Sequence, residues 1–140
     1  MKKLTSLLLA ALILISAFSA AMIPASAAFA VSNNLTVTNS SYQNDEITYT
    51  IKLKKGVTKL TGAIIKAVYD PAVVKVVSCS GNSNGVPGVY AIGQDATNSG
   101  KYSMAYINAS GYTIGADTTF FTIKFKTISA SRPKTTIRFA

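Results

Sequence analysis

The feature that most limits what this chain can fold into is an alternation of apolar and polar residues with a period of two. In residues 47–53 every second residue is Ile, Tyr or Leu, and the residues between them are Thr or Lys. The same alternation returns in residues 121–126, where Phe and Ile alternate with Thr and Lys. Successive side chains of a strand point to opposite faces, so this pattern is typical of strands with one buried face. It predicts a chain built from β-sheet.

The residue types after position 27 support the same prediction. Of these 113 residues, 34 are Val, Ile or Thr and only three are Leu. Side chains that branch at Cβ favour strands, and turn-forming residues separate the apolar runs with no helical pattern of useful length between them. The sequence therefore predicts an all-β sandwich of about eight strands. Besides the two alternating segments, the expected strands are residues 35–38, 62–69, 73–78, 86–92, 101–108 and 135–139.

The first 27 residues are of a different kind. Two lysines precede an apolar run at residues 4–15, and a proline then leads into Ala25-Ser26-Ala27. This order of a basic start, an apolar run and a small-residue cleavage motif is that of a signal peptide. We expect a signal peptide at residues 1–27, with Ala25 and Ala27 forming the cleavage motif and a competing site after Ala30.

This expectation defines the mature protein. The apolar run is shorter than the roughly 20 residues that a membrane-spanning helix needs, and no second such run follows it. We therefore expect a secreted, extracellular protein without a stable membrane anchor, with a single domain at residues 28–140.

The charged residues exclude several functions. The chain has 14 Lys and Arg, five Asp and Glu and no His, which gives a net charge of +9, of which +7 remains in residues 28–140. Without His, the Ser-His-Asp and Cys-His catalytic sites cannot form. The acids lie in or beside turns, and at most Asp95 and Asp117 could each add a ligand to a weak calcium site. We expect no enzymatic activity, no catalytic residue, no metal site and no cofactor.

The remaining polar residues indicate no nucleic-acid partner. The basic residues are mostly lysines and are spread along the strands, whereas nucleic-acid binding favours a clustered basic face with interleaved aromatic residues. Cys79 ends an apolar segment and is expected to be a small buried hydrophobe. The seven tyrosines are expected to pack mainly at the edge of the core.

One segment is more specific than these patterns. Residues 62–78 contain an apolar strand that ends in Tyr69-Asp70-Pro71 and is followed by a second apolar strand. This segment resembles the signature strand pair of cohesin domains, the scaffoldin modules of cellulosomes. Residues 45–51, 101–111 and 117–126 resemble further blocks of the same family, in the same order along the chain. The resemblance implies a jelly-roll β-sandwich that binds a dockerin module.

The alternation and the resemblance together suggest a binding surface. In the strand at residues 62–69, alternation turns Ile64, Lys66 and Val68 away from the core and so makes them a candidate interaction patch. The resemblance places an acidic type I contact at Ile64, where the acid is lost, and a second lost acid at Asn108. It also implies a hydrophobic contact at Ala105, a Gly contact at Gly111 and an aromatic contact at Tyr90. The expected partner-binding residues are Ile64, Lys66, Val68, Tyr90, Ala105, Asn108 and Gly111, and the expected docking sheet carries residues 64–68, 89–92 and 103–107.

The chain departs from the family pattern at its end. Cohesins continue with a Gly-containing strand that pairs with the first strand, so we expect that strand to be missing and residues 35–38 to form a poorly paired edge. The expected function is a non-catalytic cohesin-like module that binds a dockerin-bearing protein, such as a secreted glycoside hydrolase, in an extracellular polysaccharide-degrading assembly. Two alternatives remain: a carbohydrate-binding module, with a polysaccharide as ligand, and a cell-surface adhesin or structural domain.

Overall fold

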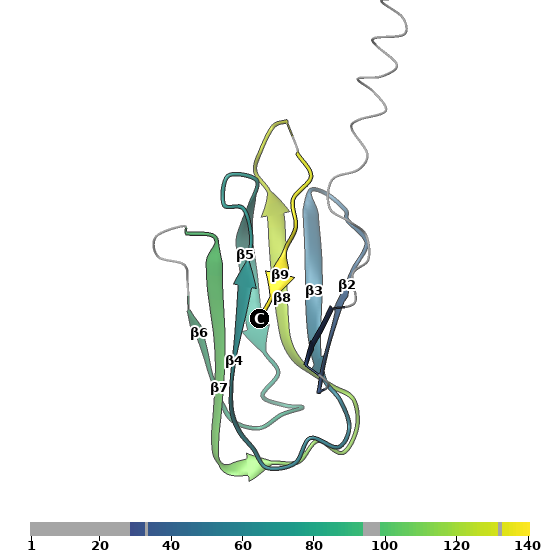
Figure 1. Ribbon diagram of the computed structural model, residues 1–140, viewed down its shortest axis with the longest axis vertical. Helices are drawn as coiled ribbons and strands as arrows, with labels where there is room; N and C mark the ends of the chain where they lie inside the picture. The colour runs from purple at the N-terminus through teal and green to yellow at the C-terminus, as the bar shows by residue number, and fades with distance from the viewer. Residues whose placement is uncertain (1–28, 33, 94–98, 132) are drawn as a thin grey trace, which may run out of the picture.

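The fold is a sandwich of two antiparallel β-sheets. The computed structural model describes residues 29–32, 34–93, 99–131 and 133–140, and for residues 29–32 only the backbone. Within these residues a five-stranded sheet has the order β1-β2-β3-β8-β5, and a four-stranded sheet has the order β6-β7-β4-β9 (Figure 1). The strands are β1 (Phe29–Ser32), β2 (Leu35–Asn39), β3 (Glu46–Leu53), β4 (Leu60–Val68), β5 (Val74–Gly81), β6 (Val89–Gly93), β7 (Lys101–Tyr112), β8 (Thr118–Thr127) and β9 (Arg138–Phe139).

This architecture confirms the all-β sandwich expected from the sequence. The expected signal peptide at residues 1–27 lies outside the described residues. In the part of the chain that the structure describes, no helix has the length and apolar character needed to span a membrane.

The two segments with the clearest alternation lie side by side in the five-stranded sheet. β3 pairs with β8, so that Ile47 faces Phe125 and Tyr49 faces Ile123 across the two strands. All four side chains are buried. The period of two therefore marked strands that place one face in the core.

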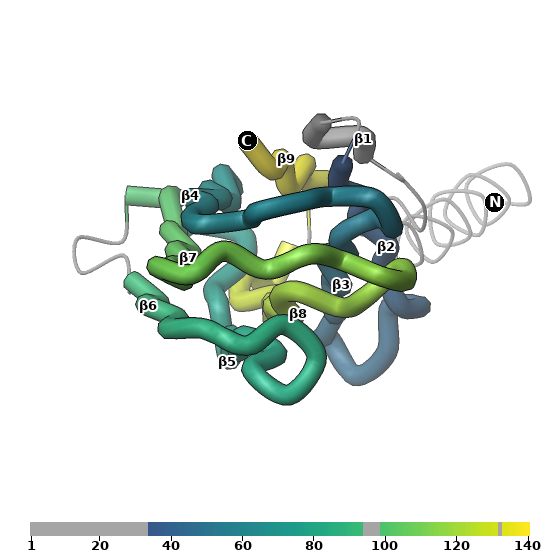
Figure 2. Tube along the Cα trace, turned by 90° about the horizontal axis from the view of Figure 1, so that it is seen from below, coloured from purple at the N-terminus to yellow at the C-terminus, as the bar shows by residue number. Residues whose placement is uncertain are grey.

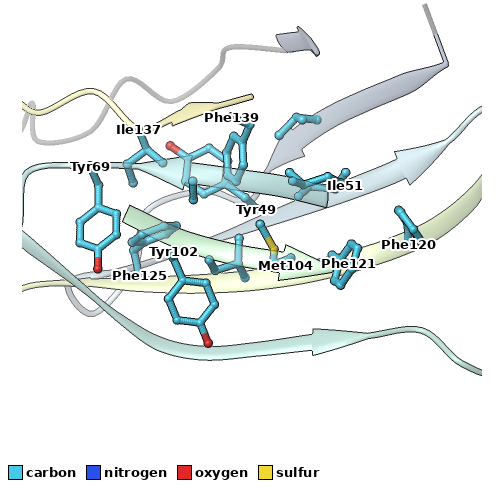
Figure 3. Close-up of a cluster of buried hydrophobic side chains, with 14 of the residues drawn as sticks. Tyr49, Ile51, Tyr69, Tyr102, Met104, Phe120, Phe121, Phe125, Ile137 and Phe139 are labelled. Atoms are coloured by element: carbon cyan, nitrogen blue, oxygen red, sulfur yellow. The ribbon is translucent and has the colours of Figure 1, made fainter. Parts of the chain in front are cut away.

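Aromatic side chains from both sheets fill the space between them (Figure 3). The Tyr49 ring lies 5.9 Å from the Phe125 ring within the five-stranded sheet and 5.3 Å from the Phe139 ring of the opposite sheet. Edge-to-face and tilted contacts of this kind add to the stabilisation from burial of apolar area. They hold the four-stranded sheet firmly against the five-stranded one.

The expected exposed edge at residues 35–38 is not found. β1 lies on the outer side of β2, with Phe29 opposite Val37 and Ser32 opposite Leu35. β1 and β2 are close neighbours in the sequence, so an antiparallel pair between them needs only a short connection. The prediction of a poorly paired edge at residues 35–38 was therefore wrong.

The C-terminal strand is shorter than expected. Of residues 135–139, only Arg138 and Phe139 pair with β4, opposite Val68 and Ala67 (Figure 2). Continuing this register would place Ile137 opposite Tyr69, which lies just past the end of β4 and donates its amide to the Gly100 carbonyl on the β7 side. Thr135, Ile137 and Phe139 nevertheless alternate inward and are buried.

Candidate functional site

The outer face of the four-stranded sheet carries most of the large exposed apolar side chains among the described residues. On β7, Tyr102, Met104 and Tyr106 point into the core, so the residues between them point outward. The same alternation along β4, β6 and β9 defines one continuous surface, which we call the docking face. Its outward residues are Gly62, Ile64, Lys66, Val68, Val89, Ala91, Gly93, Lys101, Ser103, Ala105, Ile107 and Arg138.

Strand register arranges the docking face in four rows across the sheet. Residues opposite each other on neighbouring strands share a face and lie about 5 Å apart. The first two rows are apolar, whereas the last two carry the charged side chains. The rows are Val89–Ile107–Gly62, Ala91–Ala105–Ile64, Gly93–Ser103–Lys66 and Lys101–Val68–Arg138.

The apolar exposure on this face is concentrated. Among the described residues, six large apolar side chains are exposed, and four of them lie here: Ile64 and Val89 at 69%, Ile107 at 63% and Val68 at 39%. Single exposed apolar residues are normal on a protein surface, but a contiguous group indicates an interaction site. The docking face is therefore the strongest candidate for a binding surface in the described part of the chain.

The structure brings four of the seven expected binding residues together on this face. Ile64, Lys66 and Val68 point outward from β4, as alternation predicts, and Ala105 lies directly opposite Ile64 on β7. Val89, Ala91 and Ile107 were not named as binding residues, but they lie in the segments that were expected on the docking sheet. Because Tyr106 points inward, its neighbour Ile107 could have been expected to point outward. Only the strand pairing shows that Val89 lies next to Ile107.

Tyr90 lies differently from the other expected residues. Its ring is half-buried under the sheet, with centroids 5.2 Å from the Tyr106 ring and 5.3 Å from the Phe121 ring. Its hydroxyl donates to the Val86 carbonyl oxygen at 2.7 Å. Burial, reinforced by the neighbouring Tyr106 hydroxyl, raises the pKa of Tyr90 to about 12. Tyr90 therefore packs on the core side of the four-stranded sheet, beneath the docking face.

Asn108 and Gly111 lie at the end of β7 beyond the apolar rows. The Asn108 amide donates to the Pro87 carbonyl oxygen at 2.8 Å, and its side-chain oxygen accepts from the Ser110 amide at 3.0 Å. Gly111 has a φ of 71°, and a Cβ there would lie 3.2 Å from the Cα of Lys59. Both residues thus shape the irregular end of β7, where its pairing with β4 shifts register between Leu60 and Gly62.

Most carboxylates in the described residues have a turn or pairing role. Asp70 accepts the Ala72 amide at 2.9 Å, Asp117 accepts the Lys55 amide at 2.8 Å, and Glu46 pairs with Lys124 at 3.3 Å. No group of three or more potential metal ligands occurs in the residues that the structure describes. Asp95 lies outside them.

Cys79 on β5 is half-buried and packs against the core. Burial raises the pKa of its thiol to about 11, partly offset by a backbone hydrogen bond from Ser80. A thiol with such a pKa stays protonated and unreactive near neutral pH. This agrees with the packing role expected from the sequence.

A sequence model of the cohesin domain matches residues 33–140, most of the chain. The chain belongs to the cohesin family. Cohesins are non-catalytic interaction modules, typically parts of extracellular cellulosome scaffoldins. The jelly-roll sandwich expected from the resemblance is therefore confirmed. No curated protein matches the chain.

Solved cohesin structures share this fold at low sequence identity. The CaCohA2 cohesin of Clostridium acetobutylicum, in complex with CaDoc0917, matches with a TM-score of 0.56 at 15% identity over 70% of this chain and 74% of that one. The Coh-OlpA cohesin of Clostridium thermocellum, in complex with Doc918, gives 0.56 at 17% identity over 76% and 82%. The sixth cohesin of Acetivibrio cellulolyticus scaffoldin B, in complex with a Cel5 dockerin variant, gives 0.55 at 17% over 77% and 82%.

Proposed function

We propose that this cohesin domain is an exported, non-catalytic module whose docking face binds a dockerin-bearing protein. The observation that carries the proposal is the concentration of Ile64, Val89 and Ile107 on one exposed sheet face of a cohesin fold. The three solved cohesins described above are each in complex with a dockerin. A secreted glycoside hydrolase, or a similar enzyme of an extracellular polysaccharide-degrading assembly, is the partner class that fits a cohesin.

Export is part of this proposal. The basic start, the apolar run and the Ala25–Ala27 motif of residues 1–27 support removal of a signal peptide and release of the domain outside the cell. The family match begins at residue 33, beyond that motif.

Carbohydrate binding is the weaker alternative. Modules that bind polysaccharide chains usually stack sugar rings on exposed aromatic side chains. All seven tyrosines lie in the described part of the chain and none is exposed, and the chain contains no Trp. The docking face instead offers aliphatic and cationic side chains, which suit a protein surface better than a sugar ring.

The proposal is tested by removing apolar area from the docking face. Ile64→Ser combined with Ile107→Ser should weaken binding to a recombinant dockerin by at least tenfold, because each side chain contributes about 1.5 kcal/mol or more when it becomes buried. Val77→Ser is the matched control, since Val77 is an exposed aliphatic residue on β5 of the other sheet. Isothermal titration calorimetry measures the affinities, and thermal melting confirms that each variant is folded.

The search for the partner uses the mature protein as bait for secreted dockerin-bearing proteins and a panel of recombinant dockerins, with and without a chelator. Capture of a dockerin that the double Ser variant no longer binds supports the proposal. Retention on cellulose or xylan without capture of any dockerin would instead favour the carbohydrate-binding alternative.

A further inference from the structure

The docking face is divided along its length into an apolar half and a cationic half. The rows with Val89, Ile107 and Ile64 carry no charge, whereas Lys66 and Arg138 lie in the two rows at the other end. Both cations are exposed. Lys101 lies in the same end row, opposite Val68.

The two cations are close enough to act on one partner group. Arg138 lies opposite Val68, and Lys66 is two residues before Val68 on the same face of β4. Diagonal neighbours of this kind have backbones about 7 to 8 Å apart, within the reach of long side chains. This spacing is also within the Debye length of about 8 Å at physiological salt, so the two charges reinforce each other.

No Asp or Glu side chain among the described residues belongs to the docking face. The nearest acid along β4 is Asp70, just past the end of the strand, and its side chain accepts the Ala72 amide within its own turn. Glu46 lies on the five-stranded sheet and pairs with Lys124. The cationic half therefore presents positive potential to an approaching partner.

We propose, building on the dockerin-binding function above, that the partner is a dockerin whose docking surface is acidic at one end. Its carboxylates lie over Lys66 and Arg138, and its apolar side chains lie over Ile64 and Ile107. Opposite charges at matching ends set the orientation of the complex, and they disfavour dockerins that carry Lys or Arg at that end. The charge pattern thus selects among dockerins, whereas the apolar half supplies most of the affinity.

The test compares charge reversal on two faces of the domain. The variant Lys66→Glu with Arg138→Glu is matched by Lys52→Glu with Lys75→Glu, which changes the net charge equally at exposed positions of the other sheet. The probe is a recombinant dockerin captured by the mature protein, and surface plasmon resonance gives its association rate at low and high salt. We expect roughly a tenfold or greater loss of association rate at low salt for the docking-face pair, shrinking as salt is raised.

The control pair should stay within about threefold of the unchanged protein. A second measurement exchanges the acidic residues of the captured dockerin for lysines, and the docking-face charge-reversal variant should then recover binding, since the charges are again opposite. Equal binding by the two charge-reversal pairs would overturn the acidic-partner inference while leaving the proposed function intact, provided that the Ile64 and Ile107 variant still loses binding. Failure of the unchanged protein to bind any dockerin would overturn both.

Discussion

Tyr90 supports the docking face from beneath. Its ring packs between Tyr106 and Phe121, and its hydroxyl donates to the Val86 carbonyl just before β6 begins. Gly81 on β5 leaves space for this ring, because a Cβ at that position would overlap it. Tyr90 thereby fixes the start of β6, and with it the position of Val89 on the docking face.

We predict that Tyr90→Phe lowers the free energy of unfolding by about 1 kcal/mol. The variant keeps the ring contacts but loses the hydroxyl bond, and it leaves the Val86 carbonyl without that donor. Urea unfolding measures the change, and calorimetry with a captured dockerin should show nearly unchanged affinity. A large loss of affinity at unchanged stability would contradict this placement and would show that the hydroxyl contacts the partner.

At the scale of elements, β9 links the core to the docking face. Its Phe139 ring lies 5.3 Å from the Tyr49 ring of the opposite sheet, while Arg138 faces outward beside Val68. Two residues of this strand pair with β4, and the adjacent Ala140 exchanges two backbone hydrogen bonds with Lys66. With so short a ladder, the burial of Phe139 is an important further contribution to holding the strand.

We predict that Phe139→Ala destabilises the domain by about 3 kcal/mol and releases β9 from β4. Trypsin should then cleave after Arg138 faster than in the unchanged protein, because a released strand is accessible to the protease. Arg138→Gln is the control for the strand, since it removes the outward charge without touching the core. Because it also removes the cleavage site at residue 138, cleavage of this variant is measured at Lys134. Unchanged protection of Lys134 and Arg138 in Phe139→Ala would show that β9 is held by other contacts.

Local periodicity predicted which segments form strands better than it predicted where strands end and which strands pair. β3 and β8 were recognisable because one face of each is buried along nearly its whole length. Val86 was expected in a strand because it is apolar, but it is buried in a turn in which its amide donates to the Asn82 carbonyl. Burial alone does not distinguish a strand residue from a turn residue that fills the core.

The same limit applies to the prediction of the candidate site. Alternation along β4 was sufficient to turn Ile64, Lys66 and Val68 outward. The contact between Val89 and Ile107 depends on the register in which β6 pairs with β7, and alternation within either strand does not give that register. Tyr90 was included through the family resemblance, whereas its burial follows from packing against Phe121 on the other sheet.

At the scale of the whole molecule, the two outer faces of the sandwich differ. Across the five-stranded sheet, one row reads Thr38–Thr50–Thr122–Ser80, and its neighbours are lysines and further hydroxyl residues. Such a face remains solvated, whereas the docking face exposes aliphatic groups. Because both sheets share one core, this contrast indicates which side of the molecule receives a partner.

The shared core also predicts how stability depends on pH. Burial raises the pKa of Tyr49 to about 12, as it does for Tyr90, whereas an unfolded Tyr titrates near 10. Between about pH 10 and 12 the folded state therefore holds protons that the unfolded state has released. The stabilisation is fully present below pH 10 and is lost as the pH rises towards 12. We predict that the free energy of unfolding, measured with urea, falls progressively across this window.

Tyr49→Phe separates this effect from the titration of the lysines. The lysines are unchanged in the variant, but one buried phenol no longer ionises, so its unfolding free energy should fall less steeply between about pH 10 and 12. Ultraviolet absorbance of tyrosinate provides an independent reading, since in the folded protein the phenols of Tyr49 and Tyr90 should ionise near pH 12 or only on unfolding. Equal slopes for the two proteins would mean that Tyr49 titrates normally, and hence that water reaches its hydroxyl between the sheets. The interior would then be more open than the Tyr49, Phe125 and Phe139 packing implies.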